Sequence, residues 1–415
     1  MLLLLALFLL LTSFYVLKTA REGIVLASTT FRLQGDEVKT YASGAMALLL
    51  VVLVPAYDML ANRLRRIALV NISIAFVVIS LAGFYVAAHA GVSIGLAFYV
   101  WLGVVSVFLI AQFWSFANDF YSEEQGKRVF AMIALGGSMG AIAGPRLAQI
   151  ATTRDLMLLS PILLFAYAML INIVDRCDDH QRHERIVKEV DADAGGFALV
   201  LRDPYLALIA VLLLILSLVN TTGDYILSNA VLERAMQIAP DPHATAERSE
   251  LIKTFYGDFF FHVNLVAFAL QAAFVSRVIR KLGVGRALFV LPVIVLGAYG
   301  SVAMLGTFAV VRAAKLTEGS TDYSLHNTVR QMLFLPVTRA AKYKAKAAID
   351  TFFVRFGDTL SAVLVAVAIH ALAFGRRALA IVNVALVAVW LVICVAIARR
   401  HQALTHRPLI AGELG

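Results

Sequence analysis

Positively charged residues inside apolar segments constrain this chain more than any other feature. Among its long apolar segments lie seven Lys or Arg residues, namely Lys18, Arg21, Arg146, Arg312, Lys315, Arg330 and Arg355. A charge at the depth of a bilayer costs roughly 2.5–3.5 kcal/mol on insertion scales, so it usually faces a protein interior or a wet cavity. Buried cations in a chain with many apolar segments therefore indicate a path for a solute.

The composition makes the bilayer the solvent for most of the chain. Hydrophobic residues make up 61% of the sequence, and its mean hydropathy is +0.83. These values lie well above those of soluble domains. The two cysteines, Cys177 and Cys394, cannot form a disulfide framework and have no metal-ligand spacing. We therefore expect neither a metal nor a cofactor.

Windows of apolar residues long enough to cross a bilayer predict an all-α polytopic membrane protein with about 12 transmembrane helices. The predicted spans are 2–20, 41–58, 67–88, 94–117, 129–150, 156–174, 205–228, 254–276, 287–304, 307–333, 346–373 and 378–398. The tenth is the most polar, but its connections are too short to leave it outside the membrane. It must cross as a helix lined by protein.

The distribution of basic residues predicts the orientation. With the N-terminus inside, the inner loops and tail carry 21 Lys or Arg residues. The outer loops carry 8, namely Arg32, Lys39, Arg154, Arg234, Arg248, Lys253, Arg376 and Arg377. The positive-inside rule then places both termini in the cytoplasm. The net charge of +9 marks topology and does not indicate a nucleic-acid partner.

The chain also has the pattern of a duplication. The first and seventh spans both end in polar clusters, at residues 18–22 and 220–224, and the second and eighth both lead into short basic loops. Parallel repeats of six helices are typical of major-facilitator transporters. We therefore expect two pseudo-symmetric six-helix halves, 1–175 and 204–415, with a cytoplasmic linker over 176–203 and a cytoplasmic tail.

In that architecture the first, fourth, seventh and tenth spans line a central cavity, and these spans hold most of the polar residues. The candidate substrate-binding residues are Lys18, Arg21, Glu22, Asn118, Asp119, Asn220, Asp224, Lys315 and Arg330. On a helical wheel of the tenth span, one face of about 100° holds Arg312, Lys315, Asp322, Tyr323, His326 and Arg330. We expect Lys18, Arg21, Lys315 and Arg330 to face one cavity.

The tenth span also supplies candidates for coupling transport to a proton: Glu318, Asp322 and His326. Low dielectric and neighbouring cations act in opposite directions on the Asp322 carboxyl, so a proton could move there during transport. The alternative is a structural Asp322, held by an ion pair with Lys315 or by a bond to another helix. Sequence alone leaves both readings open.

Small residues recur in the fifth span, in the stretch from Gly136 to Gly144 that precedes Pro145. Such spacing lets two helices approach closely. We favour helix packing over contact with a substrate.

Three stretches carry a resemblance to a known family. Residues Phe116-Ala117-Asn118-Asp119, followed by Gly126-Lys127-Arg128, resemble the "FANE…AKR" stretch of the bacterial and plastid ATP/ADP translocases. Lys344 to Asp350 with Arg355-Phe356-Gly357 resembles "KGKAAID…RLG", and Lys18 to Glu22 lies where that family has "RxxKD". The resemblance implies a major-facilitator-like fold and exchange of nucleotides by antiport across a bacterial inner or an organelle membrane.

Two departures from the family pattern reduce the positive charge. The family's lysine after "RLG" is Asp358 here, and residues 220–224 stand where the family has a Glu and a Trp-Lys pair. The sequence thus fits a divergent branch, an alternating-access transporter of a nucleotide or other organic anion by exchange or by proton coupling, and a monomer. The alternative is a sensor or scaffold that uses a transporter fold without transport. An enzyme is not expected, because His262 and His326 lack the neighbours of a catalytic site.

Overall fold

A computed structural model describes residues 1–415 except 31, 62, 121–122, 178–195, 338–344 and 406–415. The described residues are almost entirely helical, with one isolated β-bridge between Thr30 and Leu33. The predicted all-α class is confirmed. Most of the predicted linker lies outside the described residues.

The contacts divide the chain into two compact units. The first unit contains residues 1–186 and 227–265, and the second contains 187–226 and 266–415. The division falls inside two helices, α8 (Pro204–Ile238) and α9 (Thr245–Leu270). The predicted division into two halves in sequence order stays a prediction.

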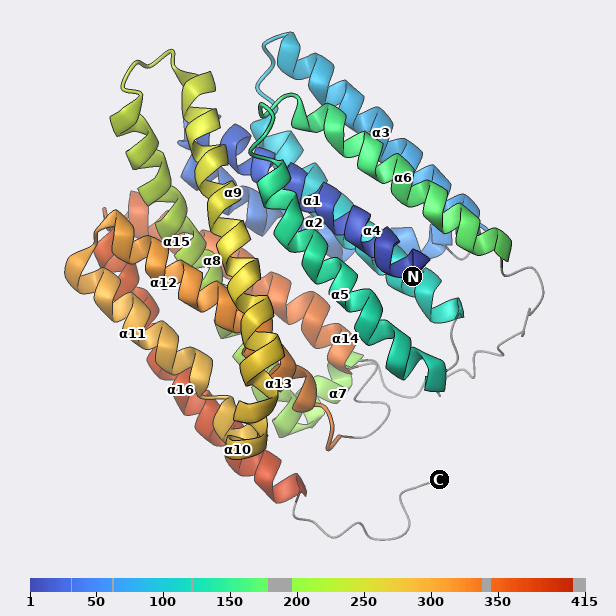
Figure 1. The fold of residues 1–415 in the computed structure, drawn as a ribbon. Coiled ribbons are helices and arrows are strands. Elements are labelled where there is room, and N and C mark those ends of the chain that lie inside the picture. Colours follow the sequence, from blue (N-terminus) through green and yellow to red (C-terminus); the bar gives the residue numbers. More distant parts are fainter. Residues whose placement is uncertain (31, 62, 121–122, 178–195, 338–344, 406–415) are drawn as a thin grey trace. The chain divides into compact units, whose positions relative to one another are not determined.

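The first unit consists of six long helices, the last part of α8 and the first part of α9 (Figure 1). The six are α1 (Leu2–Ala27), α2 (Gly35–Ala61), α3 (Arg66–His89), α4 (Gly95–Phe120), α5 (Glu123–Leu147) and α6 (Leu156–Cys177).

The second unit begins with the short helix α7 (Gly196–Arg202) and the first part of α8. After α9 it continues with η1 (Gln271–Val275), α10 (Ser276–Ala287), α11 (Val290–Leu305), α12 (Phe308–Thr321), η2 (Asp322–His326), α13 (Asn327–Met332), α14 (Lys346–Ala348), η4 (Ile349–Phe353), α15 (Val354–His370) and α16 (Arg376–Thr405). The three η segments are π-helical turns.

Each predicted span coincides with a helix or with a run of consecutive helices. Eight helices of the described residues are long and apolar enough to cross a membrane by themselves. The tenth span is the run α12–η2–α13, and the eleventh is α14–η4–α15. Hydropathy located these helices because twenty apolar residues are needed to cross the hydrocarbon core.

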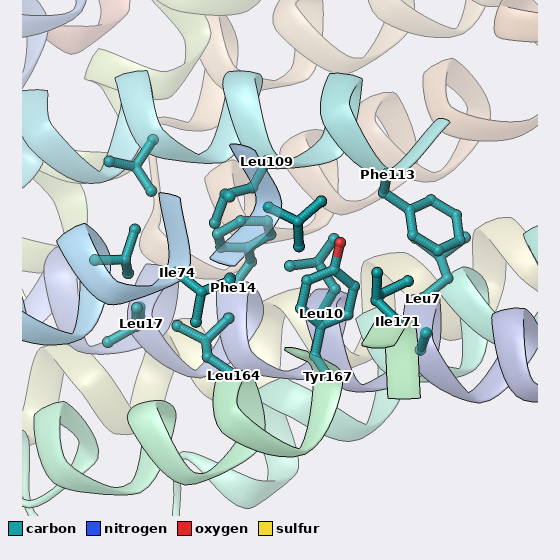
Figure 2. Close-up of a cluster of buried hydrophobic side chains, with 14 of the residues drawn as sticks. Leu7, Leu10, Phe14, Leu17, Ile74, Leu109, Phe113, Leu164, Tyr167 and Ile171 are labelled. Atoms are coloured by element: carbon teal, nitrogen blue, oxygen red, sulfur yellow. The ribbon is translucent and has the colours of Figure 1, made fainter. Parts of the chain in front are cut away.

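The core of the first unit is a cluster of large apolar side chains from α1, α3, α4 and α6 (Figure 2). α1 lies in its middle, and its Leu10, Phe14 and Leu17 meet side chains of the other three helices. The labelled members are Leu7, Leu10, Phe14, Leu17, Ile74, Leu109, Phe113, Leu164, Tyr167 and Ile171. Close packing must hold these helices, because lipid tails are as apolar as leucine and burial alone gives little preference for protein.

Glycines of α5 bring its backbone against α1. A Cβ added at Gly136 would lie 2.3 Å from the Leu4 carbonyl oxygen, and one at Gly140 would lie 2.4 Å from that of Phe8. At Gly144 the Thr12 oxygen would be 2.7 Å away. The predicted packing role of the small residues in the fifth span is confirmed.

The second unit repeats this contact on a smaller scale. A Cβ at Gly357 of α15 would lie 2.6 Å from the Leu214 carbonyl oxygen of α8. α15 belongs to the eleventh predicted span and α8 to the seventh, so fifth helix meets first helix in both repeats. This pairing agrees with the duplication expected from sequence.

Residues on the predicted polar face of the tenth span differ in exposure. Tyr323 is 48% exposed, whereas Lys315 and His326 on the same predicted face are 4% and 2% exposed. The wheel assumed 100° for every residue, but residues 322–326 form a π-turn, which closes i→i+5 hydrogen bonds and changes the angular step. The placement of these side chains on one face stays a prediction.

The outer-loop assignment was wrong for Lys39 and Lys253. Lys39 lies in α2 with 8% exposure, and Lys253 lies in α9 with 3% exposure. Lys39 lies close to Asp36 and Glu37 in the sequence, and Lys253 lies close to Glu250. These charges lower the mean hydropathy, so the windows left both lysines outside the predicted spans. Ion pairing in the fold lets such charges be buried, which a sliding window cannot see.

The packing of α5 on α1 can be tested with one methyl group. We expect Gly140→Ala to lower the melting temperature in detergent, since overpacking typically costs about 1–3 kcal/mol. Gly83→Ala in α3 is the matched control, because its Cβ meets nothing within 4 Å. A Gly140→Ala protein that melts with the wild type would contradict the packing described for this interface.

Candidate functional site

A buried carboxylate in the first unit holds two cations. Glu22 of α1 is 1% exposed, and its Oε1 is 2.8 Å from Arg21 Nη2. Its Oε2 is 2.7 Å from Lys39 Nζ of α2. The Arg21–Glu22–Lys39 cluster therefore has two positive groups and one negative group. Such a surplus is what an anionic ligand requires from a site.

Aromatic rings support the cations of α1. The Arg21 guanidinium lies 4.1 Å from the centre of the Tyr99 ring. Lys18 Nζ lies 4.4 Å from the centre of the Phe260 ring and 5.2 Å from that of Tyr15. Ring faces attract cations without neutralising their charge.

The second unit shows the opposite balance around Lys315. Lys315 Nζ of α12 is 3.0 Å from Asp224 Oδ1 of α8 and 3.1 Å from Glu318 Oε2. It also donates to the Asn220 side-chain oxygen at 2.8 Å. The Asp224–Lys315–Glu318 cluster therefore has one positive group and two carboxylates. The side chains of Lys315 and Glu318 are each 4% exposed, whereas that of Asp224 is 49% exposed.

A tyrosine and a glycine complete this cluster. The Tyr299 hydroxyl of α11 donates to Glu318 Oε2 at 2.7 Å. A Cβ at Gly223 would lie 1.7 Å from that hydroxyl oxygen and 3.3 Å from Lys315 Cδ. Only glycine at 223 leaves room for Tyr299 and Lys315 together. This explains why the polar stretch of α8 contains a glycine.

Asp358 forms a third polar cluster, also in the second unit. Its Oδ1 accepts hydrogen bonds from the Ser217 hydroxyl at 2.5 Å and from the Thr221 hydroxyl at 2.9 Å. Its Oδ2 is 3.4 Å from Arg355 Nη1. The carboxylate at this family-divergent position is thus held by two α8 hydroxyls and neutralises Arg355.

The remaining candidates do not join these clusters. Asn118 is exposed on α4, and the side chain of Asp119 lies outside the described residues. Arg330 donates to Asn327 Oδ1 at 3.2 Å. His326 packs edge-to-face on Trp390, with ring centres 5.8 Å apart.

An Asp322–Lys315 ion pair, one form of the structural alternative for Asp322, is not among the described ion pairs, in which Lys315 pairs with Asp224 and Glu318. Lys18 and Arg21 belong to one unit, and Lys315 and Arg330 to the other. The expectation that all four face one cavity therefore stays a prediction. Within the described residues no group of three His, Cys, Asp or Glu side chains could hold a metal ion.

Sequence reasoning missed the residues that complete each cluster from another helix, above all Lys39, Tyr99 and Tyr299. One signal was available for Lys39. The first span contains Glu22, whose carboxylate has two oxygens. Its neighbour Arg21 pairs with one of them, so burial of Glu22 requires a second cation for the other. No pattern in the sequence pointed to the two aromatic residues.

Comparison with known sequences finds two kinds of similarity. The family model described as "TLC ATP/ADP transporter" matches residues 299–401. ADP,ATP carrier protein 1 of Chlamydia pneumoniae is 25% identical over 340 residues, which cover 69% of this chain and 63% of that protein. The chain thus spans less than two thirds of the length of this relative.

Solved structures with the same fold are membrane transporters. The nucleoside transporter NupG superposes with a TM-score of 0.62 at 12% identity, over 97% of this chain and all of that one. A bacterial homologue of the iron transporter ferroportin gives 0.65 at 13% identity, over 96% and 98% of the two chains. At such identities the likeness concerns the fold alone.

The helical fold with many apolar helices defines a class, the all-α polytopic membrane proteins, and its fold is similar to those of the solved transporters above. The sequence matches are to the TLC ATP/ADP transporter family model over residues 299–401 and to ADP,ATP carrier proteins, which agrees with the resemblance to the ATP/ADP translocases. The predicted fold class and the resemblance drawn from the loop motifs are confirmed.

The cation surplus around Glu22 makes the stability of the first unit depend on this carboxylate. We expect Glu22→Gln to destabilise the protein strongly, because removing one partner of a buried ion pair costs about 3–5 kcal/mol. Glu247→Gln in the exposed first turn of α9 is the control. Thermal unfolding in detergent measures both, and equal melting temperatures would show that Glu22 is not holding Arg21 and Lys39.

Proposed function

We propose that this chain is an alternating-access transporter that carries a nucleotide or a similar organic anion. The proposal places it in a bacterial cytoplasmic membrane as a monomer, with both termini in the cytoplasm. The ADP,ATP carrier names of its relatives and the transporter folds of its structural neighbours support the substrate class and the mechanism. The basic residues of the inner loops support the orientation.

The cation surplus of the Arg21–Glu22–Lys39 cluster carries the proposal. Phosphate and carboxylate groups bind best to guanidinium and ammonium groups through short charge-assisted hydrogen bonds. Arg21 uses Nη2 for Glu22 and lies with its plane against Tyr99, so its side chain is already oriented. Lys18, one turn earlier on α1, adds a further positive group beside aromatic rings. An anionic substrate therefore binds first to α1.

Two cations of the second unit are already balanced by carboxylates. Lys315 already faces two carboxylates, and Arg355 faces Asp358. Neither cation adds net positive charge for a polyphosphate. The family pattern that this chain resembles implies a lysine at the position of Asp358. We therefore place the substrate among nucleotides with few phosphates, or among organic anions of similar charge.

Coupling is assigned to the tenth span. When Asp224, Lys315 and Glu318 are all ionised, their cluster has a net charge of −1. Uptake of one proton by Glu318 would make the cluster neutral. Asp322 and His326 stand at the two ends of the π-turn η2, a kind of turn that often occurs at functional sites. Proton-coupled uptake would use these residues, whereas pure exchange would not need them.

Removal of the Lys18 charge tests the anion site. We expect Lys18→Gln to weaken ADP binding and uptake in proteoliposomes by about tenfold or more, the value of one charge-assisted hydrogen bond. Arg280→Gln on the exposed face of α10 is the control and should leave both unchanged. Equal losses in the two variants would remove Lys18 from the site. A wild type that moves none of a panel of nucleotides and organic anions would favour the sensor or scaffold reading.

A change at Asp322 tests coupling. We expect Asp322→Asn to abolish the pH dependence of net uptake while exchange of internal for external substrate continues, because exchange returns the carrier loaded and needs no proton. Asp155→Asn, at an exposed residue before α6, is the control. Net uptake and counterflow measured at several pH values decide the matter. A mutant with the wild-type pH profile would make Asp322 structural.

A further inference from the structure

The middle of α8 has one accessible face, and that face is polar. Between residues 215 and 226 every residue is buried except Asn220, Thr221 and Asp224, which are partly exposed. They share one side of the helix, because residues three and four apart are neighbours on a helix surface. α8 is long and apolar enough to span a membrane. A carboxylate inside such a helix faces protein or a wet cavity and avoids lipid, so this face of α8 borders water.

Lys315 fixes the direction of two of these side chains. Its Nζ is 2.8 Å from Asn220 Oδ1 and 3.0 Å from Asp224 Oδ1. The other polar atom of each planar group therefore points away from the ammonium group. Asn220 offers a donor there, Nδ2, and Asp224 offers an acceptor, Oδ2. Within the part of the chain that the structure describes, neither atom has a protein partner, and we call these two atoms the α8 pair.

Lys315 itself has no donor left for a ligand. An ammonium group has three N–H donors, and this one already has Asn220 Oδ1, Asp224 Oδ1 and Glu318 Oε2 within 3.1 Å. The Lys315 side chain is also 4% exposed. The ammonium group lies between the two carboxylates, where a metal cation would have to lie. Lys315 therefore holds the α8 pair in place.

The surroundings keep the α8 pair rigid. The Tyr299 hydroxyl donates to Glu318 Oε2 at 2.7 Å, so the carboxylate on the far side of Lys315 is also fixed. Gly223 lies directly against this hydroxyl and against the stem of Lys315. α8 thus packs closely on α11 and α12 at the level of the pair. A donor and an acceptor that are held in this way bind a rigid planar group with little loss of conformational freedom.

The charge of the cluster decides which part of a ligand fits the pair. Asp224, Lys315 and Glu318 have a net charge of −1 when ionised, so they repel a phosphate or a carboxylate. An amino group is attracted to Asp224 Oδ2, and an acceptor beside that amino group fits Asn220 Nδ2. Adenine has such an edge, with its amino group next to a ring nitrogen. Asparagine and aspartate side chains bind base edges in this way in complexes with nucleic acids.

We propose that Asn220 and Asp224 bind the nucleobase of the transported nucleotide. Asp224 Oδ2 accepts a hydrogen bond from the amino group of the base, and Asn220 Nδ2 donates to the neighbouring ring nitrogen. This inference rests on the proposed function and narrows its substrate class. An organic anion without a base edge leaves the α8 pair unmatched, and the carboxylate of Asp224 discriminates against it.

The amino group can be removed from the ligand without any change to the protein. Purine riboside 5′-diphosphate keeps the ring nitrogens, the ribose and the phosphates of ADP but lacks the amino group. We expect the purified wild type to bind ADP about tenfold more tightly or more, the value of one hydrogen bond to a charged acceptor. Competition against radiolabelled ADP measures both affinities. Equal affinities overturn the proposal.

Asp224→Asn assigns the contact to this residue. The new amide turns its oxygen toward Lys315 Nζ, because the ammonium group repels the amide NH₂, and so presents a donor to the ligand. We expect the preference for ADP over purine riboside 5′-diphosphate to disappear. Glu233→Gln, the same change at an exposed position of α8, is the control and should keep the preference. A folded Asp224→Asn protein that binds both ligands more weakly by the same factor makes Asp224 structural and overturns the proposal.

A second variant covers an Asp224→Asn protein that does not fold. Asp224→Glu keeps the charge next to Lys315 and moves the acceptor by one methylene group, and we expect it to reduce the preference as well. An unchanged preference in this variant overturns the role of Asp224.

Two further outcomes separate the base contact from the proposed function. A wild type that binds neither diphosphate overturns the base contact together with a nucleotide substrate, whereas equal binding of the two overturns the base contact alone. 2′-Deoxy-ADP distinguishes the base from the sugar. A preference for ADP over 2′-deoxy-ADP that is lost in Asp224→Asn, without a preference over purine riboside 5′-diphosphate, assigns the α8 pair to the ribose and overturns the base contact.

Discussion

A charge that enters a bilayer must find a partner inside the protein, and the structure depends on how these partners are arranged. Glu22 holds Arg21 and Lys39 in the first unit, and Lys315 holds Asp224 and Glu318 in the second. Removing one member of such a pair exposes the other to low dielectric, which is why each buried charge fixes the helix that supplies its partner. The charged groups thereby select which polar faces of the spans meet.

Much of the fold was predictable because the bilayer leaves few choices. Each predicted span coincides with helix, and the glycines of α5 were assigned to packing that the contact with Phe8 and Thr12 of α1 confirms. The sites were less predictable. Lys39 was placed in a loop, because hydropathy averages over neighbours and ignores a carboxylate on another helix. The π-turn at residues 322–326 could not be read from the spacing of the polar residues.

Asp358 shows how a single change can redirect a site. At this position the resemblance to the translocases predicts a lysine, and a carboxylate there would have been costly without donors. Ser217 and Thr221 of α8 supply two hydroxyls, and Arg355 supplies a positive charge. The same α8 stretch has Asn220 and Gly223 beside Lys315. Donors on α8 thus match the acceptor on α15.

The glycine contact between α5 and α1 also has a mechanical meaning. Side chains between helices can change rotamer and let one helix slide over the other, but a carbonyl pressed against a glycine has no such freedom. α1 and α5 therefore move as one rigid body. The cations on α1 keep their spacing during such a motion. Strain from a conformational cycle has to be taken up elsewhere. In the transport cycle proposed above, the binding groups of α1 move together.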